Sequence, residues 1–134
     1  RMKRCMLDTN TVSHLLKGHP AVVRRVVAAP MADLCVSAIT EGEMLFGLAK
    51  RPEATRLLAA VWEFLRRVDV LLWDSAVAEH YGTLRADLER RGKILAPLDL
   101  LIATHALDVG AMLVTNDRAF GQVTGLQVED WTLR

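Results

Sequence analysis

Short apolar runs alternate along this chain with longer stretches in which apolar side chains recur every three or four residues. The short runs predict β-strands, and the longer stretches predict helices. The expected strands are 3–7, 33–36, 68–72, 111–115 and, at an edge of the sheet, 126–129. The expected helices are 11–17, 20–29, 40–50, 52–67, 75–91 and 97–108, with a further helical turn at 117–120. This alternation favours an α/β fold with a mostly parallel sheet of four to five strands.

Prolines, glycines and small polar residues set the expected helix ends. Pro20 and Pro97 stand where helices begin, whereas Gly18 and Gly110 stand just beyond the ends of helices. Further caps are expected at Ser37 or Thr40 and at Asp74 or Ser75. No linker, repeat or low-complexity tract interrupts the 134 residues, so we expect residues 1–134 to form a single domain.

Four acidic residues fall where this arrangement would bring them together. Asp8 and Asp117 each follow a predicted strand, and Glu43 and Asp99 lie near the starts of predicted helices. If the first and fourth strands are neighbours in a parallel sheet, all four carboxylates meet at the C-terminal edge, where open α/β folds keep their sites. Helix N-termini at that edge supply partial positive charge. Each like-charge pair still costs about 4 kcal/mol at about 4 Å and an effective dielectric near 20.

A bound divalent cation is the usual remedy for such repulsion. Mg²⁺ or Mn²⁺ takes carboxylate oxygens and keeps several waters, and we expect Asp8, Asp99 and Asp117 to bind it. A hydrated ion of this kind orients and polarises a phosphate and generates a hydroxide nucleophile. A carboxylate outside the coordination sphere positions the attacking water. We therefore expect Asp8, Glu43, Asp99 and Asp117 to be the catalytic acids of metal-dependent chemistry on phosphodiesters.

Each acid also has a structural interpretation, and the pattern leaves both interpretations open. Asp8 and Asp117 fit as caps of the helical segments that follow them. Thr40 and Glu43 match a capping box, in which the Glu43 side chain reaches back to the Thr40 amide. Asp99 stands in the first turn of its helix, where the helix dipole favours an anion.

Small polar residues flank the acids. The candidates for contacts to the carboxylates or to a substrate phosphate are Thr9, Asn10, Thr40, Thr115 and Asn116. Turn formation at strand ends explains the same residues equally well. Among the basic residues, Arg85 is the first candidate for a substrate contact, and most of the others are interpreted as solvated helix ends.

Composition narrows the class of protein without selecting a function. The chain is 51% hydrophobic with few aromatics, and its net charge of +1 neither indicates nor excludes a nucleic-acid partner. Cys5 and Cys35 lie in apolar runs and predict buried thiols in a reducing cytosol. No stretch approaches the ~20 apolar residues of a membrane span, and no signal peptide precedes the first strand. We therefore expect a cytoplasmic protein without a membrane partner.

Competing catalytic chemistries lack their residues. The histidines show no zinc spacing, and there is no CxxC, Gly-rich phosphate loop or serine elbow. A haloacid-dehalogenase-like phosphotransferase would need an aspartate where Asn10 stands. A phospho-receiver would need a lysine after a late strand, but no lysine follows Lys93. His105, six residues after Asp99, is expected to be a packing residue.

Four blocks in the order found here resemble the PIN-domain nucleases of the VapC toxin family. The blocks are Met6-Leu7-Asp8-Thr9-Asn10, 37–47 with Thr40 and Glu43, 97–103 with Asp99, and 114–120 with Asp117. The resemblance covers nearly the whole chain, down to Glu129-Asp130-Trp131. It implies a three-layer α/β/α PIN-like fold. It also implies that Asp8, Glu43 and Asp99 are the core acids and that Asp117 is the fourth.

The resemblance implies a function as well. It implies an Mg²⁺- or Mn²⁺-dependent endoribonuclease that is the toxin of a toxin–antitoxin pair and is neutralised by a small antitoxin in the active-site groove. Family members usually form homodimers, and several cut a tRNA at its anticodon loop, so a tRNA is the expected RNA substrate. The helices at 11–17 and 44–64 offer apolar residues that would suit an amphipathic antitoxin segment. The alternative is a PIN-like module that binds RNA or protein without cutting.

Overall fold

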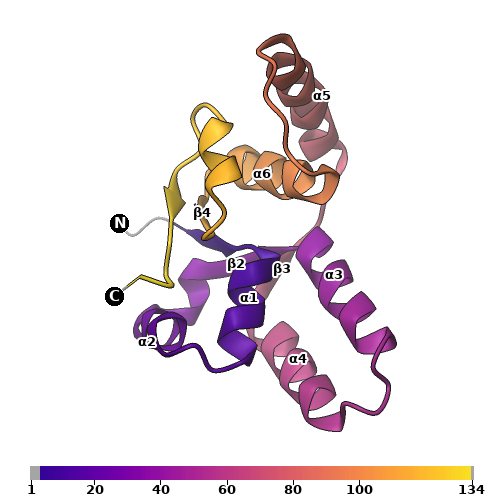
Figure 1. Cartoon of the computed structure of the whole chain (residues 1–134), viewed down its shortest axis with the longest axis vertical. Helices are drawn as coiled ribbons and strands as arrows, with labels where there is room; N and C mark the ends of the chain where they lie inside the picture. The colour runs from indigo at the N-terminus through magenta and orange to yellow at the C-terminus, as the bar shows by residue number, and fades with distance from the viewer. Residues whose placement is uncertain (1–3, 134) are drawn as a thin grey trace.

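Five parallel strands form one sheet in the order β3-β2-β1-β4-β5 (Figure 1). The computed structural model describes residues 4–133. The strands are β1 Cys5–Leu7, β2 Leu34–Ser37, β3 Asp69–Leu71, β4 Met112–Val114 and β5 Val128–Glu129. Every strand pairing is parallel, which confirms the predicted sheet; the predicted start of the first strand, residue 3, lies outside the described residues. The chain crosses from one side of β1 to the other between β3 and β4, so the strand order reverses beside β1.

Six α-helices are present in the described part of the chain, in the predicted places. They are α1 Thr9–Leu16, α2 Pro20–Ala28, α3 Ala38–Ala49, α4 Thr55–Arg67, α5 Ser75–Arg90 and α6 Pro97–Val109. Two short 3-10 helices lie at Met31–Asp33 and Arg118–Gln122. The largest difference from the predicted bounds is at α4, which begins at Thr55 rather than at residue 52, because turns occupy the residues before it.

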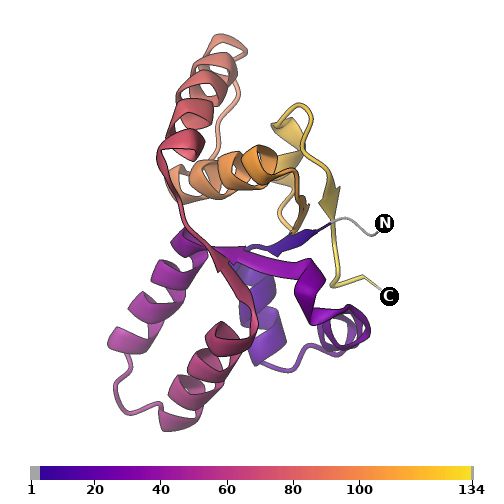
Figure 2. The same cartoon turned by 180° about the vertical axis from the view of Figure 1, so that it is seen from behind.

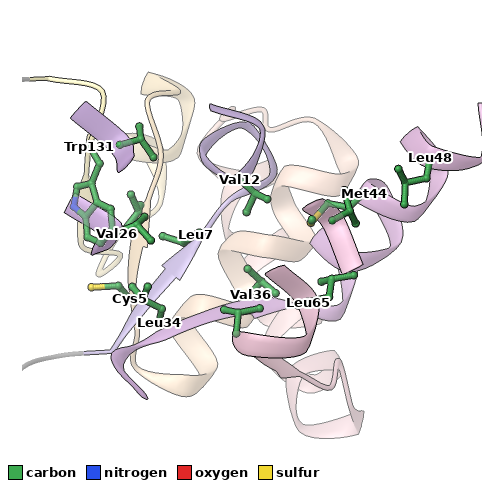
Figure 3. Packing of buried hydrophobic residues seen from close by; sticks show 14 residues of the cluster. Cys5, Leu7, Val12, Val26, Leu34, Val36, Met44, Leu48, Leu65 and Trp131 are labelled. Atoms are coloured by element: carbon green, nitrogen blue, oxygen red, sulfur yellow. The ribbon is translucent and has the colours of Figure 1, made fainter. Parts of the chain in front are cut away.

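The sheet lies between two helical layers (Figures 1 and 2). Leu7 and Val36 point toward the layer of α1, α2, α3 and α4, and the neighbouring Met6 and Cys35 point toward α5 and α6. Figure 3 shows the first of these two cores, which has Trp131 at one end. Since burying one such aliphatic side chain is worth about 1.5–3 kcal/mol, both layers are held firmly to the strands. The predicted three-layer α/β/α arrangement is confirmed.

The helix that carries Asp99 is well delimited at both ends. Pro97 is the first residue of α6, and Gly110 ends it in the left-handed conformation at φ 68°. The Gly110 amide donates to the Leu107 carbonyl at 3.2 Å. A residue with a side chain is disfavoured at this φ, so the glycine determines where α6 stops and β4 can start.

The two cysteines are buried, as expected, but they lie in different cores. Cys5 belongs to the cluster under α1–α4 and Cys35 to the cluster under α5 and α6. Burial raises the pKa of both thiols, and raises that of Cys35 to about 12. Both therefore act as small hydrophobic residues.

Over residues 4–133, no helix combines the length and the apolar character that crossing a bilayer requires.

Candidate active site

Strands β1 and β4 are neighbours in the sheet, and their shared C-terminal edge carries the predicted acids. Leu7 pairs with Val114, so the residues that follow them, Asp8 and Thr115, leave the sheet at the same level. The Asp8 amide continues the ladder by donating to the Val114 carbonyl at 3.1 Å. This edge is also the point at which the strand order reverses, which in open α/β sheets opens a crevice for ligands.

The four acids form one electrostatic group. Burial raises the pKa of Asp99, and the charges of Asp117, Asp8 and Glu43 raise it further. The pKa of Asp8 is raised by burial and, to a smaller extent, by the charge of Asp117. The fold therefore brings Asp8, Glu43 and Asp117 within electrostatic range of Asp99, and the joint catalytic role of the four acids stays a prediction.

Asp8 caps the helix that follows it, as one of its two interpretations predicted, and its catalytic role stays a prediction. Its side chain is 3% exposed, and Oδ1 accepts a hydrogen bond from the Thr11 amide at 2.8 Å, so Asp8 caps α1. Side-chain hydrogen bonds from Thr115 and Thr11 lower its pKa and offset part of the cost of burial. The capping bond uses Oδ1 and fixes the carboxylate at the end of β1.

Glu43 is held by Thr9, and the predicted capping box is wrong. Ser37 caps α3 by accepting from the Ile39 amide at 3.1 Å, so Thr40 lies inside the helix. Glu43 turns instead toward α1, where its Oε1 accepts from Thr9 Oγ1 at 2.6 Å. Thr9 Oγ1 lies 3.3 Å from the buried Thr40 Oγ1. Thr9 therefore links Glu43 on α3 to α1, with Thr40 beside it, and a role of the two threonines in orienting Glu43 for catalysis stays a prediction.

The segment after β4 orients the fourth acid. Asp117 Oδ1 accepts from the Ala119 amide at 2.9 Å and caps the 3-10 helix Arg118–Gln122. The buried Thr115 Oγ1 accepts from the Asp117 amide at 3.0 Å. The Thr115 side chain therefore contacts both the backbone amide of Asp117 and the carboxylate of Asp8, and it links two of the acids.

The remaining candidates lie outside the acid group. Asn10 and Asn116 are exposed, and Asn116 Nδ2 contacts His14 Nε2 at 3.4 Å rather than a carboxylate. Arg85 is exposed on α5, where Nε donates to Glu89 at 3.1 Å and Nη1 donates to the Tyr81 hydroxyl at 3.0 Å. Arg85 lines a separate hollow between α5 and the start of α6. Direct substrate contacts by these three residues stay predictions.

The donor set suits a hard cation, although the site is not pre-arranged around one. Within residues 4–133, no three acidic, histidine or cysteine side chains are placed so as to hold a metal ion as they stand. Mutual repulsion separates carboxylates, and Mg²⁺ needs only one or two of them because it keeps several waters. All the available donors are carboxylate oxygens, which Mg²⁺ and Mn²⁺ prefer. Asp8, Asp99 and Asp117 as metal ligands therefore stay a prediction.

One buried polar pair behind the site is absent from the sequence-based predictions. His105 on α6 is 1% exposed, and its Nδ1 lies 2.7 Å from the hydroxyl of Ser37, the cap of α3. The Leu72 backbone faces the ring and favours its protonated form, but no well-formed bond reaches Nε2 from any described residue. Burial lowers the pKa of His105. His105 is thus a packing residue, as expected, that also ties α6 to α3.

An apolar groove opens beside Glu43, between α1, α3 and α4. Its volume is about 220 Å³. Its lining residues are Thr9, Ser13, Leu16, Lys17, Glu43, Met44, Gly47, Lys50, Arg51, Leu57 and Val61. The floor is aliphatic and the rim is basic, so the groove suits an apolar segment that carries acidic groups.

Comparison with known proteins identifies the family. The PIN domain family matches residues 5–126. The tRNA(fMet)-specific endonuclease VapC of Shigella flexneri is 40% identical over 132 residues, which is 98% of this chain and 100% of that protein. The chain belongs to the PIN-domain family, as a ribonuclease of the VapC type. The VapC endonuclease of Salmonella typhimurium is 38% identical over 131 residues, 97% of this chain and 99% of that protein.

Solved structures of VapC-type complexes share this fold. The DNA-bound VapBC complex of Salmonella typhimurium superposes with a TM-score of 0.89 and 38% identity, covering 97% of this chain and 99% of that chain. The VapBC2 complex of Rickettsia felis, bound to a promoter DNA fragment, gives a TM-score of 0.86 at 30% identity, with 95% and 98% covered. The family resemblance seen in the sequence blocks is confirmed.

Proposed function

We propose that this VapC-type ribonuclease is an Mg²⁺- or Mn²⁺-dependent endonuclease that cuts tRNA and acts as the toxin of a toxin–antitoxin pair. The single observation that carries the proposal is the mutual coupling of Asp8, Glu43, Asp99 and Asp117 at the switch point of the sheet. Retaining four repelling carboxylates in one crevice is costly unless a cation is bound there in the working enzyme.

The roles of the residues follow from their contacts. Asp8, Asp99 and Asp117 would hold the ion, which when bound supplies positive charge to the phosphate and acidifies a water molecule. Asp8 and Asp117 each accept a backbone amide at Oδ1, which fixes both carboxylates at the C-terminal edge of the sheet. Glu43, oriented by Thr9, positions the attacking water and accepts its proton.

The substrate class rests on the relatives. Two VapC proteins that are 38% and 40% identical over nearly their full lengths are named as endonucleases specific for the initiator tRNA, tRNA(fMet). We therefore propose a tRNA substrate, with tRNA(fMet) as the first RNA to test. A tRNA substrate implies that the protein acts in the cytoplasm.

The partner rests on the groove beside Glu43. The solved relatives are VapBC complexes, in which VapC is assembled with its VapB partner. We propose that a small antitoxin places an apolar segment on Leu16, Met44 and Val61, with acidic residues toward the rim formed by Lys17 and Lys50. Because Glu43 lines the same groove, a segment seated there blocks access to the acids.

We also propose a homodimer, which light scattering would report as twice the mass of one chain.

The test is cleavage of a tRNA(fMet) transcript by the purified protein in Mg²⁺, Mn²⁺ or EDTA. Asp99→Asn is expected to lose activity at least about 100-fold, more than the 10- to 100-fold typical of residues that only support a metal ligand. Asp108→Asn, the same change on the exposed end of α6, is the matched control and should cleave normally. Cleavage that persists in EDTA, or that Asp99→Asn does not reduce, contradicts the proposal. Binding without cleavage in either metal supports the non-catalytic module instead.

A further inference from the structure

The segment that follows Asp8 is free of acidic residues over a long stretch. No aspartate or glutamate occurs between Asp8 and Asp33, although the chain holds 16 acidic residues in all. The same stretch contains Lys17, the Arg24-Arg25 pair and two histidines. It forms α1 and α2, which pack against each other, and α2 lies beside the C-terminal segment (Figures 1 and 2). Helices α1 and α2 therefore contribute only basic and neutral side chains to this flank, and its acidic groups, Glu129 and Asp130, come from the C-terminal segment.

The two neighbouring arginines of α2 have different surroundings. Arg25 pairs with Glu129 and lies over the Trp131 ring, 5.0 Å from its centroid, so it fastens the C-terminal segment to α2. Arg24 is exposed and makes no ion pair with any residue of 4–133. The charge of Arg24 is thus available to a ligand, whereas that of Arg25 is already used.

A row of polar side chains runs from Asn116, which is next to Asp117 in the chain, to Arg24. Asn116, the neighbour of Asp117, contacts His14 Nε2 at 3.4 Å. The His14 ring meets the His19 ring edge to face, with centroids 5.2 Å apart and planes inclined by 70°. His19 and Arg24 then line the same hollow. We name this row, Asn116–His14–His19–Arg24, the α1–α2 track.

The track ends in a hollow of about 490 Å³ between the start of α2 and the C-terminal segment. Its lining residues are His19, Pro20, Ala21, Arg24 and Thr132. The nearest acidic residue in sequence, Asp130, accepts hydrogen bonds from the Thr132 amide and hydroxyl at 2.8 and 2.6 Å. Asp130 is held within its own turn and does not line the hollow, whereas Arg24 does.

We propose that the α1–α2 track binds the phosphate backbone of the RNA strand as it leaves the acid group, with a phosphate at Arg24 in the hollow. This inference rests on the proposed ribonuclease function. The four acids repel RNA, so the strand must gain its affinity from cations and hydrogen-bond donors beside them. Asn116, His14 and His19 supply donors for phosphate oxygens, and Arg24 supplies the lasting positive charge.

The test compares Arg24→Gln with Arg56→Gln, which removes another exposed and unpaired arginine, at the start of α4. Both variants carry the same net charge, and neither side chain is packed in a core. Steady-state cleavage of the tRNA(fMet) transcript should show KM raised about tenfold for Arg24→Gln with kcat unchanged, since the contact is uniform binding. Filter binding at several salt concentrations uses protein that carries Asp99→Asn. Adding Arg24→Gln to it should reduce the slope of log K against log salt by about 0.7–0.9. Arg24→Lys should restore the slope because it restores the charge.

The outcomes separate this inference from the proposed function. If wild-type protein cuts the transcript but Arg24→Gln matches Arg56→Gln in KM and salt slope, the track is refuted and the ribonuclease assignment stands. A fall in kcat at constant KM for Arg24→Gln also refutes it, because a backbone contact remote from the acids does not alter the chemical step. If no RNA is cut or bound, both proposals fail together.

Discussion

Replacing Thr9 with valine removes the contact that holds Glu43. Thr9 Oγ1 donates to Glu43 Oε1 at 2.6 Å, and this bond joins the first turn of α1 to α3. Valine keeps the branching of threonine and lacks only its hydroxyl, so at this half-buried position the main change is the loss of the bond. Glu43 would then lose its partner and sample several rotamers. Thr9→Ser keeps the hydroxyl and is the matched control.

The size of the effect follows from the type of bond. A hydrogen bond to a charged group contributes about 1.5–3 kcal/mol, which corresponds to a factor of about 10 to 150 in rate at 1.36 kcal/mol per tenfold. Both side chains are half-buried, so water compensates part of the loss, and the lower end of the range applies. We expect Thr9→Val to lower kcat about tenfold and to change stability by less than about 1 kcal/mol.

The assay is single-turnover cleavage of the tRNA(fMet) transcript across a Mg²⁺ titration, with thermal melts of each variant alongside. Thr9→Ser should retain most of the wild-type rate, and Thr9→Val should lose it without a fall in melting temperature. Equal rates for Thr9→Val and wild type would refute the orienting role of the bond. A loss of equal size in Thr9→Ser would show that the methyl group, and not the hydroxyl, matters.

Three further predictions test other parts of the molecule. The raised pKa of Asp99 means that the native fold disfavours its charged form at neutral pH, so Asp99→Asn should melt at a higher temperature than wild type in EDTA; a lower melting temperature would contradict this. Burial lowers the pKa of His105 in the folded state, so the unfolded chain binds more protons below its ordinary value of 6.5, and stability is lost as pH falls through this window. Urea denaturation at pH 7.5 and 5.5 should therefore show a smaller pH dependence for His105→Asn, and an unchanged dependence would argue against a buried neutral ring. Gly47 lies in a helix and lines the groove, with open space around an added Cβ, so Gly47→Leu should block binding of the proposed antitoxin and leave the fold intact. Gly82→Leu, at an open helical position on α5, should bind it normally in the same pull-down.

Much of the architecture was readable from local patterns. Residues close together in the chain predict the order of strands and helices. They also predict the end of α6 at Gly110 and the placement of the acids at the ends of elements. Pro97 and Gly110, for example, constrain their own backbone wherever they stand. The ordered blocks around Asp8, Glu43, Asp99 and Asp117 are sufficient to predict the family from the sequence alone.

Local patterns gave a wrong prediction where the same residues fit both a local contact and a contact with a distant segment. Thr40 and Glu43 carry a valid capping-box signature, but Ser37 caps α3 and Glu43 bonds to Thr9, 34 positions away in the chain. The choice depends on α1 packing beside α3, which no short window contains. The bond between Ser37 and His105 spans 68 positions and was unpredictable for the same reason.

The sequence by itself determined which segments are strands and helices, and which side chains have the chemistry to bind a cation. Only the folded arrangement places β1 beside β4, brings three other carboxylates within electrostatic range of Asp99, and sets His14 and His19 between Asn116 and the hollow at Arg24. The physical reason is range: backbone preferences and periodicity act over a few residues, whereas these contacts form only when segments distant in the chain bury their apolar faces against one sheet.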